Sequence, residues 1–148
     1  MMKLSRNHTL LSSALLLLPC VADALEIPSL KPGLWEIRAQ NFSDGKTGDK
    51  DGTMQQCMDA ATMAASKQMN DEYNKKNCSK NETRRDGNKW IRSLICKVGA
   101  STLNGQQTLE FNGDNAYHSD GISNYDPAFS GLTRKRVIVD AKWLGPCK

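Results

Sequence analysis

The sequence predicts a mainly β, α+β domain: a single curved antiparallel sheet of about seven strands with one helix, stapled by two disulfides. Three observations predict it: apolar and polar residues alternate in several segments, turn signals separate these segments, and four cysteines follow an export leader. A length of 148 residues fits one domain, and 39% hydrophobic with 24% charged residues is typical of a globular protein.

The first 24 residues have the pattern of a secretory signal peptide. Lys3 and Arg6 precede a mostly apolar run from Leu10 to Leu18, and Ala22-Asp23-Ala24 supplies the small residues of a cleavage site. The apolar run has about half of the roughly 20 residues that a membrane span needs. We therefore predict cleavage after Ala24, a single β-rich domain over residues 25–148, and a periplasmic location.

The mature chain is nearly balanced in charge. Removing residues 1–24 takes away two bases and one acid, so 18 bases and 15 acids remain and the formal charge is +3. This excess is too small to indicate a nucleic-acid partner. No second apolar stretch is long enough for a transmembrane segment after cleavage.

The first elements of the mature chain are two strands and a helix. Residues 35–40 alternate apolar and polar, a polar loop over Ser43–Gly52 follows, and a second strand is predicted over Thr53–Met58. Asp59 is the expected N-cap of a helix that runs to about Asn74. Its predicted buried stripe recurs every four residues and consists of Ala61, Ala65, Met69 and Tyr73.

A hairpin and three further strands are expected after the helix. The hairpin joins Asn81–Arg85 to Lys89–Lys97, and a break follows around Gly99–Gly105. Strands at Gln106–Phe111 and 116–119 flank a turn, and a longer loop with a proline covers Gly121–Gly131. The last strand alternates apolar and polar residues over 134–143. The helix is expected to pack on the sheet or to plug one end, and a ligand would occupy the concave face.

The four mature cysteines predict two disulfides. Cys20 lies in the leader, where acylation is the alternative to cleavage. A three-residue turn at Asp86–Asn88 would place Cys78 opposite Cys96, whereas a two-residue turn would shift the register by one. Elimination then pairs Cys57 with Cys147. The alternative pairs Cys57 with Cys78 across the helix and Cys96 with Cys147.

Several short motifs resemble a known family. Pro32-Gly33-Leu34-Trp35-Glu36 opens the first strand, and single cysteines follow at Cys57, Cys78 and Cys96. An aromatic-containing strand lies around Tyr117, and Leu144-Gly145-Pro146-Cys147 lies near the end of the chain. In this combination the chain resembles a family of small exported proteins of Gram-negative bacteria that is catalogued as a domain of unknown function. The resemblance implies a periplasmic location and paired cysteines, and it brings no catalytic residue.

The strongest candidate site is a cationic one. Arg84, Arg92, Arg134 and Arg136 fall on the predicted hairpin and on the last strand, and neighbouring strands would make them a possible anion-binding face. The alternative is an ordinary solvated face of the sheet.

Catalytic and metal motifs are missing from the sequence. His118 is the one histidine after the leader, and no nucleophile elbow, zinc motif or phosphate loop is present. We therefore expect no catalytic residue, metal or cofactor, and we favour a non-catalytic module that binds an envelope component or a protein partner.

Two alternatives stay open. The first is a hydrolase that uses carboxylates from among Glu36, Asp120 and Asp140. The second is soft-metal binding by methionine thioethers, although packing in the core is the simpler role for these side chains. The methionines in question are Met54, Met58, Met63 and Met69.

Overall fold

The computed structural model describes residues 25–44, 46–47 and 51–148. The predicted leader, its cleavage after Ala24 and Cys20 lie outside the described residues. Within them the chain forms nine elements. These are β1 (Gly33–Ser43), β2 (Lys46–Thr47), β3 (Gly52–Met58), α1 (Ala60–Asn77), β4 (Cys78–Asp86), β5 (Lys89–Val98), β6 (Ser101–Asn112), β7 (Ala116–Phe129) and β8 (Leu132–Gly145).

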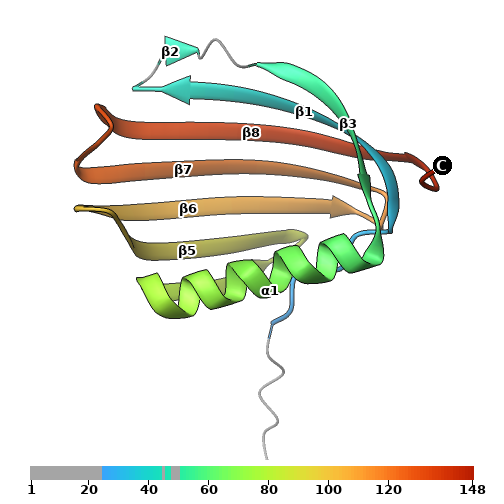
Figure 1. Ribbon diagram of the computed structural model, residues 1–148, viewed down its shortest axis with the longest axis horizontal. Coiled ribbons are helices and arrows are strands. Elements are labelled where there is room, and N and C mark those ends of the chain that lie inside the picture. The colour runs from blue at the N-terminus through green and yellow to red at the C-terminus, as the bar shows by residue number, and fades with distance from the viewer. Residues whose placement is uncertain (1–24, 45, 48–50) are drawn as a thin grey trace, which may run out of the picture.

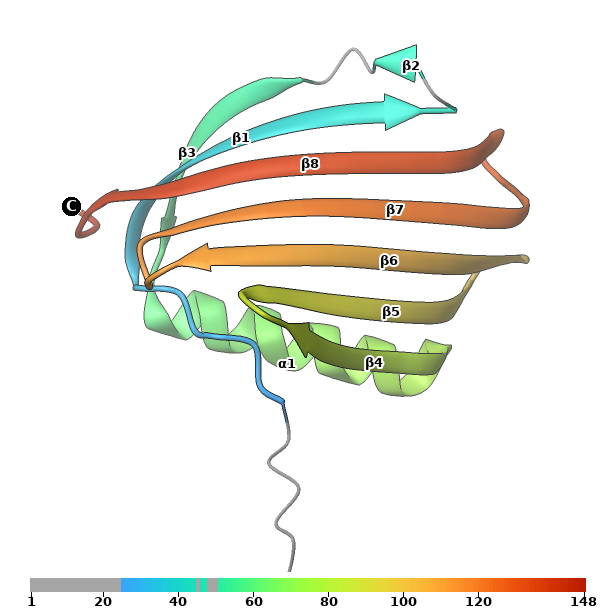
Figure 2. The same ribbon diagram turned by 180° about the vertical axis from the view of Figure 1, so that it is seen from behind.

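All the strands belong to one antiparallel sheet (Figure 1). The strand order is β2-β1-β8-β7-β6-β5-β4, and β3 pairs with β1 beside β2. At one end of the sheet, β3 and the start of β1 curve away from the straight course of the central strands (Figures 1 and 2). One antiparallel sheet, one helix and two disulfides confirm the predicted fold class.

The register divides the side chains of the sheet into two faces. Paired residues of an antiparallel sheet point to the same face, and successive residues along a strand alternate. We call one face the apolar face. Its apolar residues are Trp35, Ile37, Ala39, Met54, Cys78, Trp90, Leu94, Cys96, Val98, Leu103, Leu109, Phe111, Tyr117, Tyr125, Val137, Val139, Ala141 and Trp143. We call the other the charged face, because paired acids and bases cover it.

The core lies on the apolar face. Six side chains of the described residues are buried, and the register places all of them there: Trp35, Trp90, Cys96, Ser101, Ser119 and Ala141. Trp35 is fully buried, and its ring lies 6.0 Å from that of Tyr117. The alternation predicted for the first and last strands is therefore confirmed, because both place their apolar residues on this face.

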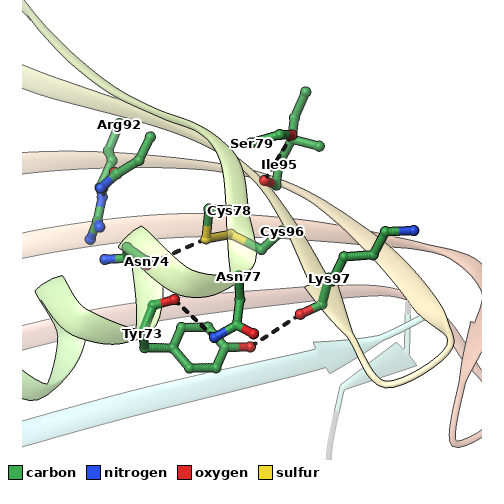
Figure 3. Close-up of a disulfide and its surroundings, with 10 residues drawn as sticks. Tyr73, Asn74, Asn77, Cys78, Ser79, Arg92, Ile95, Cys96 and Lys97 are labelled. Atoms are coloured by element: carbon green, nitrogen blue, oxygen red, sulfur yellow. Dashed lines mark hydrogen bonds between the residues drawn. A yellow bond between two sulfur atoms is a disulfide. The ribbon is translucent and has the colours of Figure 1, made fainter.

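Helix α1 connects the two edges of the sheet. It follows β3, which lies beside β1 at one edge, and it leads directly into β4 at the other. In Figure 1 it lies in front of β4 and β5, and in Figure 2 behind them. Figure 3 shows Arg92 and the Cys78–Cys96 bridge on the side of β5 toward α1, with Ile95 on the other side. The helix therefore lies on the side of the apolar face.

The buried stripe predicted for α1 is wrong. Asp59 caps the helix as predicted, since its carboxylate accepts a hydrogen bond from Thr62 N at 2.7 Å. No residue of α1 is buried, however, and Met69 and Tyr73 are 68% and 46% exposed. The helix lies along the β4–β5 edge, and its Tyr73 hydroxyl donates to the carbonyl oxygen of Lys97 (Figure 3). Its apolar stripe therefore has no layer of side chains to pack against.

The hairpin of β4 and β5 has the predicted disulfide with a different register. Asp86 pairs with Lys89, so the turn has two residues rather than the expected three. A register shift between Cys78 and Lys80 compensates for this difference and returns Cys78 to a position opposite Cys96. The two cysteines are bonded, as are Cys57 and Cys147, so both predicted pairs are confirmed.

The strands of the second half are longer than predicted. The break expected at Gly99–Gly105 is a short turn before Ser101, and the loop expected at Gly121–Gly131 is mostly the second half of β7. Its pairing with β8 is interrupted between Asn124 and Phe129, around Pro127. Proline is tolerated where the ladder is already broken, so the hairpin continues past it.

Candidate functional site

The charged face is a network of ion pairs between neighbouring strands. Six of the seven ion pairs in the described part of the chain lie on it, and the seventh is within α1. The six are Lys80–Glu82, Arg84–Asp86, Lys89–Glu110, His118–Asp140, Arg136–Asp120 and Lys142–Glu36. Most of the charged side chains of this face are therefore already paired with one another.

Two carboxylates of this face are held in their ionised form. The hydrogen bond from Lys142 lowers the pKa of Glu36 below its ordinary value. The guanidinium of Arg136 donates to both oxygens of Asp120 and lowers the pKa of that carboxyl. Neither group is therefore suited to donate a proton near neutral pH, which a general acid must do.

A hollow of about 630 Å³ on the charged face brings two of the three predicted carboxylates together. Glu36 and Asp140 both line it, with His118 and Lys142, whereas Asp120 lies outside it. Nδ1 of His118 is 2.7 Å from an oxygen of Asp140. The hollow therefore holds Glu36, Asp140 and a third acid, Glu110. The condition for a carboxylate hydrolase, that two of the predicted carboxylates line one pocket, is met for Glu36 and Asp140.

The four predicted arginines do not form one cationic face. Arg84 lies on β4, and Arg134 and Arg136 lie on β8, so four strand spacings, roughly 19 Å, separate the two groups. Arg84 and Arg136 are ion-paired. The register places Arg92 on the opposite, apolar face. The prediction of a shared site required neighbouring strands, and the sheet order separates them.

The apolar face is only partly covered. Outside its six buried side chains, residues such as Ile37, Leu94, Leu109 and Val139 are half-buried, and Met54 at its β3 edge is 58% exposed. It has no acidic residue on any strand, whereas Arg85, Arg92 and Lys135 lie on it. Two of its uncharged polar side chains satisfy each other, since Gln107 donates to the hydroxyl of Ser119 at 2.9 Å.

A cavity of about 300 Å³ lies between this face and the segment before β1. The sheet contributes Leu109, Phe111, Tyr117 and Val139 with the Gln107–Ser119 pair, and the segment contributes Ile27, Pro28 and Leu30. Burial raises the pKa of Tyr117, as expected beside apolar side chains. The volume is at the lower end of the roughly 300–1,000 Å³ of small-molecule pockets.

The segment over residues 25–32, which we call the lead-in segment, is anchored at its second half. Lys31 N donates to the carbonyl oxygen of Asp114, and the indole nitrogens of Trp35 and Trp143 donate to the carbonyl oxygens of Lys31 and Pro32. Leu25 at its start is 50% exposed. No role was predicted for this segment from the sequence. Its apolar residues Leu25, Ile27 and Leu30 could have indicated that it packs on the sheet.

The methionines do not form a core cluster. Met54 and Met69 are exposed, which corrects the expectation that they pack in the core, because β3 is an edge strand and α1 has no partner layer. Among the described residues, no three His, Cys, Asp or Glu side chains are placed to hold a metal ion.

In the described part of the chain, no helix has the length and apolar character needed to cross a membrane. The comparison with curated proteins and the comparison with solved structures found no match. Residues 30–147 match the family described as "Protein of unknown function (DUF3617)". The match spans most of the chain and agrees with the expected membership of a family of unknown function, so the chain belongs to the DUF3617 family.

Proposed function

We propose that this protein is a non-catalytic module of the periplasm that binds an apolar envelope component on the apolar face of its sheet. The predicted signal peptide and the two disulfides support a periplasmic location, since disulfides persist in oxidising compartments. The binding role rests on a single observation, which is that α1, on the side of the apolar face and along the β4–β5 edge, buries none of its own residues.

An uncovered apolar layer is unusual in a folded domain. A sheet normally buries its apolar face against a second layer, and contiguous exposed apolar surface marks a binding site. Here four hydrophobic residues of the described chain are buried, although the strands place many more apolar side chains on this face. A ligand between the sheet, α1 and the lead-in segment would complete the missing layer.

The test is a titration with N-phenyl-1-naphthylamine, an uncharged apolar fluorophore, of protein purified from the periplasm after export. We expect saturable binding that Leu109→Gln weakens about tenfold, because a buried leucine contributes roughly 1.5–3 kcal/mol. Leu109 lines the cavity. The matched control is Ile91→Gln, the same kind of change on the charged face of β5.

Two outcomes would contradict the proposal. One is the absence of saturable binding by folded protein, with folding checked by circular dichroism. The other is an equal loss of affinity in the two variants, which would show that the fluorophore does not select the apolar face.

A carboxylate hydrolase is the second candidate, because Glu36 and Asp140 line one hollow with His118. In this alternative Glu36, whose pKa is lowered, would act as base or nucleophile, and Asp140 would have to supply the proton. A panel of chromogenic glycosides and esters tests it. Turnover that both Glu36→Gln and Asp140→Asn abolish, and that Asp120→Asn retains, would favour the hydrolase over the binding module.

A further inference from the structure

We propose that the ligand of the apolar face is an anionic amphiphile, whose apolar chain occupies the cavity beneath the lead-in segment and whose headgroup binds Arg92. The inference rests on the proposed binding function and adds the chemical class of the ligand. It combines the charge of the apolar face, the partners of Arg92 and the position of Arg92 beside the cavity.

The charges on the strands of the apolar face favour an anion. Every acidic residue of the long strands lies on the charged face, so an anion bound to the apolar face meets no carboxylate of the sheet. The cations of the apolar face are Arg85, Arg92 and Lys135. The strands of the apolar face therefore present positive charge only to such a ligand.

Arg92 is hydrogen-bonded to an amide and not to a carboxylate. Its Nε donates to the amide oxygen of Asn81 at 3.0 Å, and it has no acidic partner among the described residues. Arg84, on the same hairpin and the opposite face, is instead paired with Asp86. A half-buried guanidinium has five donors, and a carboxylate or phosphate can accept two of them side by side.

Arg92 lies beside the cavity. Gln107 lines the cavity, and it is the residue directly opposite Arg92 in the β5–β6 pairing. Opposed residues have Cβ atoms about 4.5–5.5 Å apart, so a headgroup at Arg92 and a chain in the cavity can belong to one molecule. Figure 3 shows Arg92 on the side of β5 toward α1, where a ligand between helix and sheet would lie.

The experiment compares four ligands that share one twelve-carbon chain: dodecanoate, dodecyl phosphate, dodecanol and dodecyltrimethylammonium. Each is titrated into the exported, delipidated protein by calorimetry, below its critical micelle concentration. We expect both anions to bind at least about tenfold more tightly than the alcohol, since hydrogen bonds to charged groups are the strong ones. The cation is expected to bind more weakly than the alcohol.

The variants are Arg92→Gln and its matched control Arg84→Gln, which removes the same charge from the same hairpin. Arg92→Gln should remove the advantage of the anions and leave the affinity for dodecanol unchanged, whereas Arg84→Gln should leave all four affinities unchanged. The ratio of dodecanoate to dodecyl phosphate affinity distinguishes a fatty acid from a phospholipid as the source of the headgroup.

Two results would overturn the inference, and each is distinguishable from a failure of the proposed function. Equal affinity for anion and alcohol, or an equal effect of the two arginine variants, would leave apolar binding intact and exclude Arg92 as the headgroup site. Failure of all four ligands to bind folded protein would contradict the proposed function itself.

Discussion

The charged face and the apolar face of the sheet share the same strands but differ in how their side chains find partners. On the charged face, six ion pairs link acids to bases on the same or neighbouring strands. On the apolar face, six side chains are buried, while many others are half-buried and Arg92 has only an amide partner. The charged side chains of one face find their partners within the sheet, whereas the apolar side chains of the other face need a covering layer to become buried.

This difference separates stability from binding. Exposed ion pairs contribute little to the free energy of unfolding, so the charged face mainly keeps the sheet solvated. Buried apolar area contributes most of the stabilisation, and the four buried hydrophobic residues, Trp35, Trp90, Cys96 and Ala141, all lie on the apolar face. The half-buried apolar side chains of the same face contribute less, because part of their surface stays in contact with solvent.

The largest expected effect on stability is at Trp35, the fully buried residue of the apolar face. Trp35→Ala should lower the free energy of unfolding by about 3–5 kcal/mol, because the ring is fully buried and its indole nitrogen donates to Lys31 O. Phe42→Ala, an aromatic change on the charged face of the same strand, should cost clearly less. Urea unfolding followed by circular dichroism measures both, and equal losses would contradict the assignment of the core to the apolar face.

An intermediate effect is expected at Gly33, where the backbone comes close to the end of β8. Its φ of +148° is one that other residues rarely adopt, and an added Cβ would collide with the indole nitrogen of Trp143 and the carbonyl oxygen of Gly145. Gly33→Ala should therefore cost about 2 kcal/mol or more. Gly131→Ala is the control, since a Cβ there meets open space and only the positive φ is unfavourable. A smaller loss at Gly33 than at Gly131 would show that the contact with Trp143 does not restrict the backbone.

The smallest expected effect is on the charged face. Asp120→Asn breaks the pair with Arg136 and should lower the free energy of unfolding by about 0.2–1 kcal/mol, less in high salt. The folded pKa of Asp120 lies below its unfolded value, so its contribution is present above about pH 4 and is lost as the pH falls through the folded pKa. Urea titrations over a series of pH values from 6 downwards should therefore show a difference between wild type and variant that is largest at pH 6 and shrinks as the pH falls. A difference that does not change with pH would contradict the ion-pair origin.

The local sequence was sufficient to predict those features of the fold that depend on a few adjacent residues. The alternation in β1 and β8, the N-cap at Asp59 and the turn signal at Gly87 each depend on a few adjacent side chains. Both disulfides were also predicted correctly. The pair Cys78–Cys96 was expected from a three-residue turn, however, and the chain has a two-residue turn there. The register shift near Ser79 corrects for the shorter turn, and no local signal fixed its position.

Residue patterns alone indicated which residues are apolar and where strands alternate, and simple counting indicated that four cysteines form two disulfides, because these features need no long-range information. Only the tertiary structure decided the order of the strands, which puts β4 and β8 far apart and separates Arg84 from Arg136. It also decided that the apolar stripe of α1 stays exposed and that Arg92 lies beside an apolar cavity. The physical reason is that a periodic pattern says which side of an element is apolar, whereas the partner that reaches that side is set by long-range pairing across the whole sheet.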